Sequence, residues 1–277
     1  MASLTVRSTS DPVLALAAGG AFLLTRPEHN SIVLTVLAER IARFEDGRYW
    51  WTCRGDDVVA FAMQSPNGFR AVVAPADRAA VEALVDRMAE DAPDLPGVMG
   101  EAATAAAFAG RWAEVQVAPV LPVEAQRLYR IHAIRHPEGV RGGLRAAGPA
   151  DRPVLLDWTA AFLRDIESDP VFDPGRLVDR HLGAGRLWIW DFEGDPVSMA
   201  AVSATAGAIS RIAFVYTPPE HRRHGYAAAC VAALSERVLA EGVGCILHTQ
   251  LHNPTSNGVY RRIGYVALAE ILIYRFG

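Results

Sequence analysis

A short segment between residues 217 and 227 has the composition of an anion-binding loop. It reads Thr-Pro-Pro-Glu-His-Arg-Arg-His-Gly-Tyr-Ala, after a β-rich run at residues 209–216 and before an alanine-rich helical run at residues 227–241. A strand, a tight loop and a helix start direct several backbone N–H groups to one place, and the helix dipole adds partial positive charge there. Gly225 and Ala227 are small where an anion must approach closely. The sequence therefore predicts a phosphate site at this turn.

Two spacings in this half of the chain resemble the signatures of the GNAT superfamily of acyl-CoA-dependent N-acetyltransferases. Residues 222–227, Arg-Arg-His-Gly-Tyr-Ala, are similar to its pyrophosphate-binding pattern Arg/Gln-x-x-Gly-x-Gly/Ala. Residues 253–265, Asn-Pro-Thr-Ser-Asn-Gly-Val-Tyr-Arg-Arg-Ile-Gly-Tyr, resemble its second pattern, in the order and at the distance that the family uses. A bare six-residue match is weak, but two independent patterns in one context carry the resemblance.

The resemblance implies roles for particular residues. Main-chain groups of Val215 and Thr217 would bond the pantetheine arm of acetyl-CoA in a notch beside the next strand, where a backbone N–H would stabilise the oxyanion. Tyr260 would act as the general acid that protonates the departing thiolate; its alternative is a packed aromatic with a satisfied hydroxyl. The cofactor-binding residues expected in full are Val215, Tyr216, Thr217, Arg222, Arg223, His224, Gly225, Tyr226, Ala227, Ala228, Asn253, Ser256 and Tyr260.

The group that would deprotonate the acceptor amine is not assigned by the sequence. Many members of the family use a glutamate on the strand before the loop, whereas residues 209–217 hold no carboxylate. Ser210, Tyr216, a water chain or a carboxylate from an acidic segment, residues 165–173, remain candidates. That segment is either a solvated turn or a lining that attracts a cationic amine. Its carboxylates are Asp165, Glu167, Asp169 and Asp173.

Two histidine pairs have a spacing that invites comparison with metal ligands. His221 and His224 lie within the expected phosphate loop, and His248 and His252 lie on an expected strand, where residues four apart stand about 13 Å apart. Neither pair has an evident third ligand. The sequence therefore predicts no metal site.

Composition limits the class of protein. A formal net charge of −4 gives no reason to expect nucleic acid as a partner. The N-terminus lacks the pattern of a signal peptide, and no run approaches about 20 uninterrupted apolar residues, so no membrane partner is expected. Cys53, Cys230 and Cys245 have neither metal-type nor disulfide-type spacing and are expected to be reduced, buried thiols. These features predict a cytoplasmic monomer or homodimer.

The chain also contains an internal repeat. The hairpin expected at residues 47–63 resembles one at residues 185–202, and Leu-Tyr-Arg-Ile at 128–131 matches Ile-Tyr-Arg-Phe at 273–276. The offsets are about half of the 277 residues, 138 for the hairpins (185 − 47) and 145 for the second match (273 − 128). The expected fold is therefore α/β, with two tandem GNAT-like domains. Each would be a mixed, mostly antiparallel sheet flanked by helices, with residues 1–139 as one domain and 140–277 as the other.

The first copy is expected to be degenerate. Its helices are predicted at residues 11–19, 30–43, 79–90 and 101–115. At the turn that corresponds to the phosphate loop, residues 74–80 read Ala-Pro-Ala-Asp-Arg-Ala-Ala. No glycine is present, and Asp77 puts a carboxylate where a phosphate would lie. We therefore expect the first copy not to bind the coenzyme.

The sequence as a whole predicts an enzyme, an acetyl-CoA-dependent N-acetyltransferase that transfers the acetyl group to a primary amine by direct attack on the thioester. The acceptor would be a small-molecule or peptide amine. One alternative is a non-catalytic acyl-CoA-binding or sensing protein with the same fold, which the missing carboxylate on residues 209–217 favours. Another is an acyltransferase that uses a longer acyl-CoA.

Overall fold

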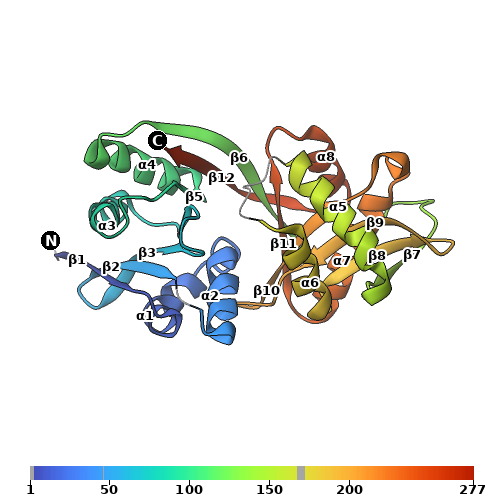
Figure 1. The fold of residues 1–277 in the computed structure, drawn as a ribbon, viewed down its shortest axis with the longest axis horizontal. Helices are drawn as coiled ribbons and strands as arrows, with labels where there is room; N and C mark the ends of the chain where they lie inside the picture. The colour runs from blue at the N-terminus through green and yellow to red at the C-terminus, as the bar shows by residue number, and fades with distance from the viewer. Residues whose placement is uncertain (1–2, 46, 167–171) are drawn as a thin grey trace. The chain divides into compact units, whose positions relative to one another are not determined.

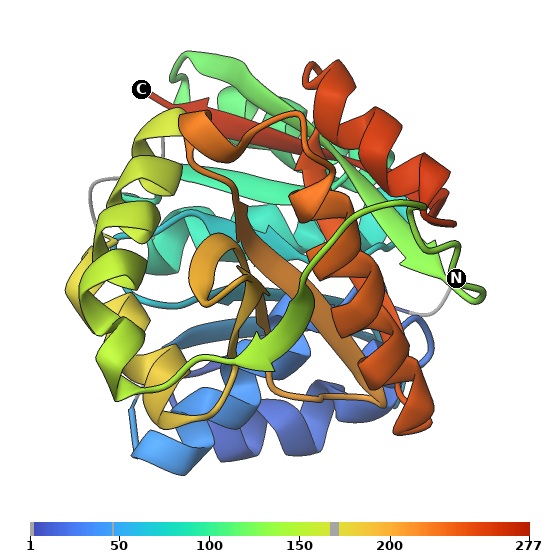
Figure 2. The same ribbon diagram turned by 90° about the vertical axis from the view of Figure 1, so that its right-hand side faces the viewer.

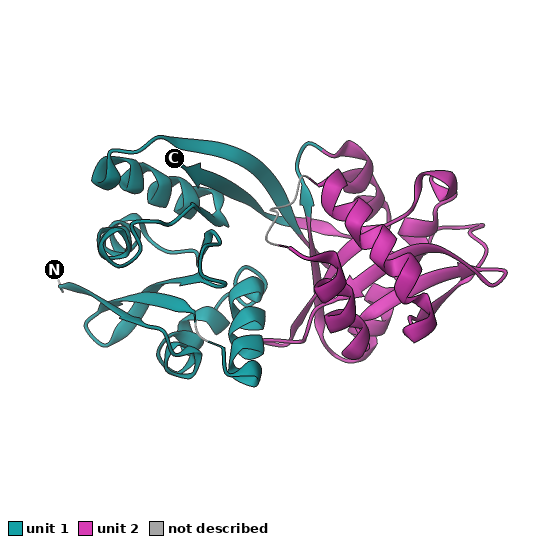
Figure 3. Cartoon of the chain, in the orientation of Figure 1, with its two compact units in different colours: residues 1–128, 249–252, 268–277 teal, residues 129–248, 253–267 magenta. Residues whose placement is uncertain are grey.

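The structure, a computed structural model, describes residues 3–45, 47–166 and 172–277 (Figure 1). Glu167 and Asp169 of the acidic segment lie outside these residues. The chain forms two compact units: unit 1 is residues 1–128, 249–252 and 268–277, and unit 2 is residues 129–248 and 253–267 (Figure 3). Each unit is a sheet with flanking helices. The mixed, mostly antiparallel α/β architecture predicted from the sequence is confirmed.

Unit 1 is a sheet in the strand order β1-β2-β3-β4-β5-β12-β6, in which β4 and β5 are parallel. Its strands are β1 (Leu4–Thr9), β2 (Arg48–Arg54), β3 (Asp57–Gln64), β4 (Ala71–Val73), β5 (Gly97–Glu101), β12 (Val266–Phe276) and most of β6 (Val120–Ile131). Its helices are α1 (Pro12–Leu24), α2 (Ser31–Arg43), α3 (Arg78–Asp91) and α4 (Ala102–Gln116). Apolar residues at helical spacing explain the packing: α3 buries Val81, Leu84, Val85 and Met88 beside Phe108 and Trp112 of α4.

The helix α1 is longer than the sequence predicts. The expected end is Gly19, but the helix continues to Leu24. Gly19 lies inside this helix and packs closely against β3. A Cβ atom at this position would stand only 2.4 Å from Cδ2 of Phe61. This glycine permits a close approach of helix and strand and does not end the helix.

Unit 2 continues from the last residues of β6 in the strand order β11-β10-β9-β8-β7. Its other strands are β7 (Gly143–Ala146), β8 (Leu187–Phe192), β9 (Asp195–Val202), β10 (Ile209–Tyr216) and β11 (Gly244–Gln250). Its helices are α5 (Arg152–Asp165), α6 (Pro174–Gly183), α7 (Tyr226–Ala240) and α8 (Pro254–Arg262), with short 3₁₀ turns η1 (Pro149–Asp151) and η2 (Pro219–His221). In Figure 2, α5 in yellow-green and α7 in orange flank these strands on opposite sides.

Two hydrophobic clusters cover the two faces of the unit 2 sheet. The α7-side cluster includes Ile212, Tyr226, Cys230, Leu247 and Tyr260. The α5/α6-side cluster includes Leu155, Trp158, Val178, Met199 and Tyr216, with Phe162 and Phe214 packed against it. From Met199 to Val202, successive residues of β9 enter the two clusters in turn, as the two-residue period of a strand requires.

The closing strands of the repeat do not stay with their own halves of the chain. β12 follows α8 but pairs antiparallel with β5 in unit 1, where Ile273 lies opposite Met99. Tyr129 and Ile131 at the end of β6 are buried in the α7-side cluster of unit 2. The compact units therefore differ from the sequence halves, and the domain boundary at residues 139 and 140 stays a prediction. No helix in the part of the chain described here is long and apolar enough to span a bilayer.

Candidate functional site

The strands β10 and β11 part before either of them ends. Their parallel register joins four residue pairs, from Ile209 with Gly244 to Ile212 with Leu247, whereas β10 runs to Tyr216 and β11 to Gln250. Parallel strands that separate at their carboxyl ends leave main-chain groups available to a ligand, which is where open α/β sheets bind ligands. The register with β11 therefore ends at Ile212, before the residues of β10 beside which the resemblance implies a notch.

A β-bulge marks the same point of β10. The pairing with β9 shifts register between Ala213 and Tyr216, and Phe214 has a φ of 50°. Regular alternation would place Phe214 on the same face as Ile212. Instead Ile212 packs in the α7-side cluster, whereas Phe214 and Tyr216 pack on the α5/α6 side. The bulge therefore redirects the last residues of the strand, as bulges next to ligand sites commonly do. The residue pattern of β10 does not predict this bulge.

The loop after β10 ends at a helix N-terminus with free backbone donors. Gly225 is the N-cap of α7, and no side chain in residues 3–45, 47–166 or 172–277 caps this helix. The first donor within the helix is the N–H of Ala229, which bonds the carbonyl of Gly225 at 3.0 Å. The N–H groups of Tyr226, Ala227 and Ala228 precede it and have no carbonyl one turn earlier in the helix. With the dipole of a 15-residue helix behind them, these donors form a site suited to an anion.

Gly225 is required by its geometry. Its φ is +84°, in the left-handed region, and a Cβ atom there would lie 2.8 Å from Cγ2 of Val140. Both the backbone conformation and the contact with Val140 favour glycine over any other residue. The sequence pattern places this glycine correctly at the start of the helix.

The side chain of Arg222 contacts three neighbours. Its Nε donates to the carbonyl of Thr217 at 3.0 Å, and its guanidinium carbon lies 5.8 Å from the ring centroid of Tyr216. A terminal nitrogen forms an ion pair of 3.2 Å with Asp165 at the end of α5. Arg222 thus connects the loop to the acidic segment, a contact that the sequence did not suggest.

The aromatic ring of Tyr226 holds the loop histidine next to it. The ring of His224 stacks on Tyr226 with centroids 5.5 Å apart, and its Nδ1 lies 3.3 Å from the carbonyl oxygen of His221. Arg223, between the two histidines, has a φ of 68°. These contacts shape the turn through which the chain enters α7.

The second motif builds the short helix α8. Asn253 is its N-cap, because its Oδ1 accepts the N–H of Ser256 at 3.0 Å. Asn257, which the sequence did not single out, is buried; its Nδ2 donates to the carbonyl of Asn253 at 2.7 Å. Its Oδ1 accepts from the hydroxyl of Tyr129 at 2.8 Å. The motif residues are thereby tied to the end of β6.

Tyr260 is a buried phenol on α8. It is 8% exposed, lies in the α7-side cluster, and its ring meets that of Tyr265 edge-on with centroids 6.0 Å apart. Burial raises the pKa of Tyr260 well above its usual value, and Cys230 adds to the effect. The phenol is therefore protonated throughout the physiological range and can donate a proton or a hydrogen bond.

Tyr265 has a structural role. Its hydroxyl lies 2.7 Å from Oγ of Ser235 and 3.3 Å from Sγ of Cys245. Burial raises the pKa of Tyr265 far above the ordinary value for tyrosine. All three cysteines are buried and reduced, and burial raises the pKa of the Cys230 thiol to about 12, which makes it unreactive.

Three of the candidate bases from the sequence, Ser210, Tyr216 and Asp165, are engaged in other contacts. Ser210 is 3% exposed and its Oγ lies 2.9 Å from the hydroxyl of Thr205. Tyr216 is enclosed between Trp158, at 6.4 Å between centroids, and the guanidinium of Arg222. Asp165 is paired with Arg222. As for metals, the described residues contain no group of three His, Cys, Asp or Glu side chains arranged to hold one.

The corresponding turn in unit 1 is built differently. Asp77 caps α3: its Oδ1 accepts the N–H of Ala80 at 2.9 Å, and its Oδ2 pairs with Arg54 at 2.8 Å. The bond from the Ala80 backbone, followed by the one from Arg54, lowers the pKa of Asp77. A carboxylate of the chain thus occupies the anion position at this helix.

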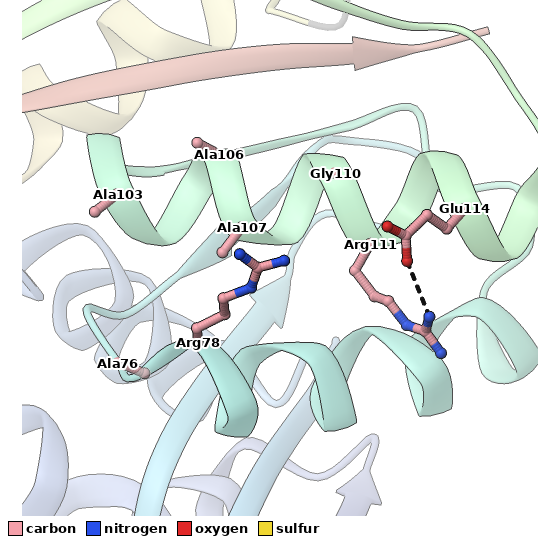
Figure 4. Close-up of a pocket in the computed structure, with 8 residues that line it drawn as sticks. All are labelled: Ala76, Arg78, Ala103, Ala106, Ala107, Gly110, Arg111 and Glu114. Carbon is pink, nitrogen blue, oxygen red and sulfur yellow. Dashed lines mark hydrogen bonds and ion pairs between the residues drawn. The ribbon is translucent and has the colours of Figure 1, made fainter.

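A pocket of about 460 Å³ lies beside this turn, between α3 and α4 (Figure 4). Alanines and Gly110 of α4 form much of its lining; Arg78 extends from the start of α3 toward Ala107, and Arg111 and Glu114 lie together at one end. Arg111 is paired with Glu114 and with Asp86, and Arg78 with Glu82, so its charges are largely balanced. The complete lining is Ala76, Arg78, Ala103, Ala106, Ala107, Gly110, Arg111 and Glu114.

Comparison with known proteins agrees with this geometry. Residues 192–273, which include β10, the loop, α7 and α8, match the family model described as FR47-like protein. A search of curated proteins found no match. Among solved structures, a GNAT-family acetyltransferase from Colwellia psychrerythraea is similar with a TM-score of 0.62 at 10% identity, over 99% of this chain and 100% of that one.

A GCN5-related N-acetyltransferase from Sphaerobacter thermophilus gives a TM-score of 0.62 at 18% identity, over 98% of this chain and 95% of that one. At these identities the likeness concerns the fold. The chain has the GNAT fold over nearly its whole length, and the resemblance to GNAT acetyltransferases found in its sequence is confirmed at that level.

Proposed function

We propose that this protein is an acetyl-CoA-dependent N-acetyltransferase whose reacting centre lies in unit 2. The observation that carries the proposal is the uncapped N-terminus of α7 directly after the bulge at which β10 leaves β11. One short loop joins the backbone N–H donors of α7, which can bind an anion, to the open edge of β10. This arrangement suits a ligand with a diphosphate at one end and a thioester on an extended arm.

Acetyl-CoA is the co-substrate proposed for this site, and it supplies an activated acetyl group. The backbone N–H groups of residues 223–228 would hold its diphosphate, with Gly225 and Ala227 allowing close approach. Main-chain groups of Val215, Tyr216 and Thr217 would bond its pantetheine arm. Asn253, Ser256 and Tyr260 of the second motif would complete the site. Arg222 and Arg223 would add positive charge near the diphosphate, and the ring of His224 would lie beside the diphosphate.

The residues of the site support direct transfer. The amine nitrogen would attack the thioester carbon while a backbone N–H at the β10 bulge stabilises the oxyanion. Tyr260 would then donate its proton to the departing sulfur, since its phenol is protonated over the physiological pH range. No metal takes part in this proposal, and the acceptor is a small-molecule or peptide amine.

A second candidate is a non-catalytic acyl-CoA-binding or sensing protein. The observation that favours it is the absence of any Asp or Glu on β10, whose residues read Ile-Ser-Arg-Ile-Ala-Phe-Val-Tyr. A third is an acyltransferase specific for a longer acyl chain. We further propose a monomer or homodimer in the cytoplasm, with neither nucleic acid nor membrane as partner.

Release of free thiol from acetyl-CoA in the presence of a panel of primary amines tests the proposal. We expect release that depends on the amine and gives an acetylated product by mass spectrometry. Calorimetric binding of acetyl-CoA without turnover on any amine would support the sensing function instead. Tighter binding of a longer thioester than of acetyl-CoA would support the third candidate.

A matched pair of variants tests which unit binds the coenzyme. Ala227→Glu places a carboxylate at the second position of α7, and Ala79→Glu places one at the same position of α3. We expect Ala227→Glu to abolish coenzyme binding through charge repulsion, and Ala79→Glu to leave about one site per chain with unchanged affinity. Loss of binding in Ala79→Glu alone would contradict the placement in unit 2.

A further inference from the structure

The first helix of unit 1 is apolar on every side. α1 reads Pro-Val-Leu-Ala-Leu-Ala-Ala-Gly-Gly-Ala-Phe-Leu-Leu and contains no charged residue. One face packs on its own unit, where Ala15, Gly19 and Leu23 are buried and Gly19 stands against Phe61 of β3. A helix at the surface of a globular protein normally carries polar residues on its outer face, so an apolar outer face indicates a partner.

The outer face of α1 is a regular apolar seam. Leu14 and Leu24 are 57% and 52% exposed, and Ala17 and Ala21 between them are exposed as well. The steps between these four residues are three, four and three, which is the a/d spacing of a coiled-coil heptad. Large residues at the ends and small residues at the centre let a second helix approach closely along this seam.

The order of residue types along the apolar seam is the same in both directions. Leu14 and Leu24 lie five residues before and after position 19, and Ala17 and Ala21 lie two residues before and after it. In a two-fold symmetric pair, every contact between two residues occurs twice with the chains exchanged. An antiparallel second copy of α1 therefore places leucine opposite leucine at both ends of the seam and alanine opposite alanine at its centre.

The charges at the ends of α1 favour the same orientation. Asp11 precedes the helix as its N-cap, and Arg26, which pairs with Glu101 but stays 44% exposed, follows it. Antiparallel pairing brings the acidic start of one helix to the basic end of the other and sets the two helix dipoles in opposite directions. Parallel pairing would bring like charges together.

We propose that α1 is a homodimer interface, in which the apolar seam of one chain packs antiparallel against the seam of a second copy. This gives unit 1, whose anion position is occupied by Asp77, a task that does not depend on acyl transfer. One helix pair covers less surface than a standard interface of about 1,600 Å², so the dimer should form reversibly in the micromolar range.

Two substitutions at opposite ends of the seam test the interface. Leu14→Arg introduces a cation, and Leu24→Asp introduces an anion, each opposite a leucine of the second copy. Each substitution occurs twice in a symmetric dimer and removes a leucine that the dimer buries. Each should therefore weaken dimerisation at least about 100-fold in sedimentation equilibrium. Both positions are exposed in the single chain, so thermal unfolding should change little.

Mixing the two variants tests the antiparallel register itself. In a mixed pair the introduced cation of one chain faces the introduced anion of the other, and at the opposite end two leucines meet. We expect an equimolar mixture of Leu14→Arg and Leu24→Asp to dimerise although each variant alone is monomeric. A chain with both substitutions should also dimerise with itself, because positions 14 and 24 lie about 15 Å apart along one helix and cannot pair within it.

Leu121 supplies the matched controls. It lies on β6, outside α1, and its 59% exposure is close to that of the two seam leucines. Leu121→Arg and Leu121→Asp should both dimerise as the wild type does. Vesicles of phosphatidylcholine should bind neither the wild type nor the variants, because the second copy covers the seam.

Each result decides for or against the interface. A wild type that stays monomeric throughout the micromolar range overturns the proposal, as does a dimer that neither Leu14→Arg nor Leu24→Asp weakens. Variants that fail to associate when mixed rule out the antiparallel seam. A monomeric wild type that binds the vesicles would assign the face to a membrane surface instead. Dimerisation that is lost in each variant and regained in the mixture supports the proposal.

Discussion

Gly225 satisfies two independent constraints at the start of α7. One is local, a φ of +84°, and the other is tertiary, the 2.8 Å that would separate its Cβ from Val140. Gly194 at the β8–β9 turn has a similar φ of +93°, but a Cβ atom there would meet no heavy atom within 4 Å. The two glycines therefore allow the conformational effect to be separated from the contact.

We predict that Gly225→Ala lowers stability by about 1–2 kcal/mol, the cost of the left-handed conformation, and weakens coenzyme binding about ten-fold. The reason for the second effect is that the loop must move away from Val140, which shifts the N–H groups of residues 226–228. Gly194→Ala should show a comparable loss of stability with normal binding. Urea unfolding and calorimetry measure the two quantities.

Val140→Ala in the Gly225→Ala background provides a further check, because it removes the methyl group that the new Cβ would meet. Binding should recover in part while the conformational cost remains. Equal binding by Gly225→Ala and the wild type would show that the loop does not hold the coenzyme.

At the level of single residues, the sequence could predict the loop but not all that surrounds it. Gly225 and Ala227 follow from motif spacing, because a helix N-terminus near an anion constrains the residue types locally. Phe214 and Asn257 did not follow from it. The bulge depends on pairing with β9, and the role of Asn257 depends on Tyr129, which is 128 residues away in sequence. Contacts of that kind leave no local pattern.

The N-termini of α3 and α7 show how one supersecondary element can serve two purposes. Both follow a strand that has a parallel neighbour, β4 with β5 and β10 with β11. Asp77 supplies the anion for α3 from within the chain, whereas α7 begins at Gly225 without a side-chain cap among the described residues. A helix that is capped internally gains stability, and a helix left uncapped keeps its donors for a ligand.

We predict that Asp77→Ala destabilises unit 1 by about 1 kcal/mol near neutral pH, the usual contribution of an N-cap. The pKa of Asp77 is lowered in the folded state, so its stabilisation is fully present above the unfolded pKa, about 3.9, and is lost as pH falls through the lower folded value. Urea unfolding of the variant and the wild type should therefore differ at pH 7 and converge in acid.

Arg54→Ala serves as the comparison for this prediction. It removes only the ion pair to Asp77, between side chains that are 43% and 48% exposed, and such exposed pairs contribute little. Its effect should be well below that of Asp77→Ala. A pH-independent difference between Asp77→Ala and the wild type would contradict the capping role.

Element boundaries followed from the sequence where local signals agree. α2, α3 and α4 begin and end within one residue of the expected limits, because their apolar spacing and their turns coincide. For α1, the sequence predicts a helix only as far as Gly19, whereas the helix continues to Leu24. The packing of Phe61 against that glycine overrides the local preference, and only the tertiary structure contains this information.

Over the whole molecule, the two halves of the chain repeat one element order but exchange their last strands. Strand, two helices, three strands, helix, strand, helix and strand occur from β1 to β6 and again from β7 to β12. The chain nevertheless changes unit after residues 128, 248, 252 and 267. The sequence predicts the repeat but not the exchange of the closing strands β6 and β12. These two strands have similar residue patterns, so the pattern alone does not decide which sheet each strand joins.

This exchange means that the second half should not fold alone when it is cut at the repeat boundary. A fragment of residues 140–277 lacks Tyr129 and Ile131, which are 0% and 2% exposed in the α7-side cluster. Loss of a large buried side chain costs about 2–5 kcal/mol, and the Oδ1 of Asn257 would lose its partner at a further cost of about 1–3 kcal/mol. That total is comparable with the stability of an ordinary domain.

We therefore predict that residues 140–277 give no cooperative thermal transition and no calorimetric acetyl-CoA binding, whereas residues 118–277, which retain β6, regain both at least in part. Tyr129→Phe in the full chain isolates the bond to Asn257 and should cost about 1–3 kcal/mol without abolishing folding. A 140–277 fragment that melts cooperatively and binds acetyl-CoA as the full chain does would show that β6 is dispensable. The strand exchange would then have no part in building the site, and residue 140 would be a true domain boundary.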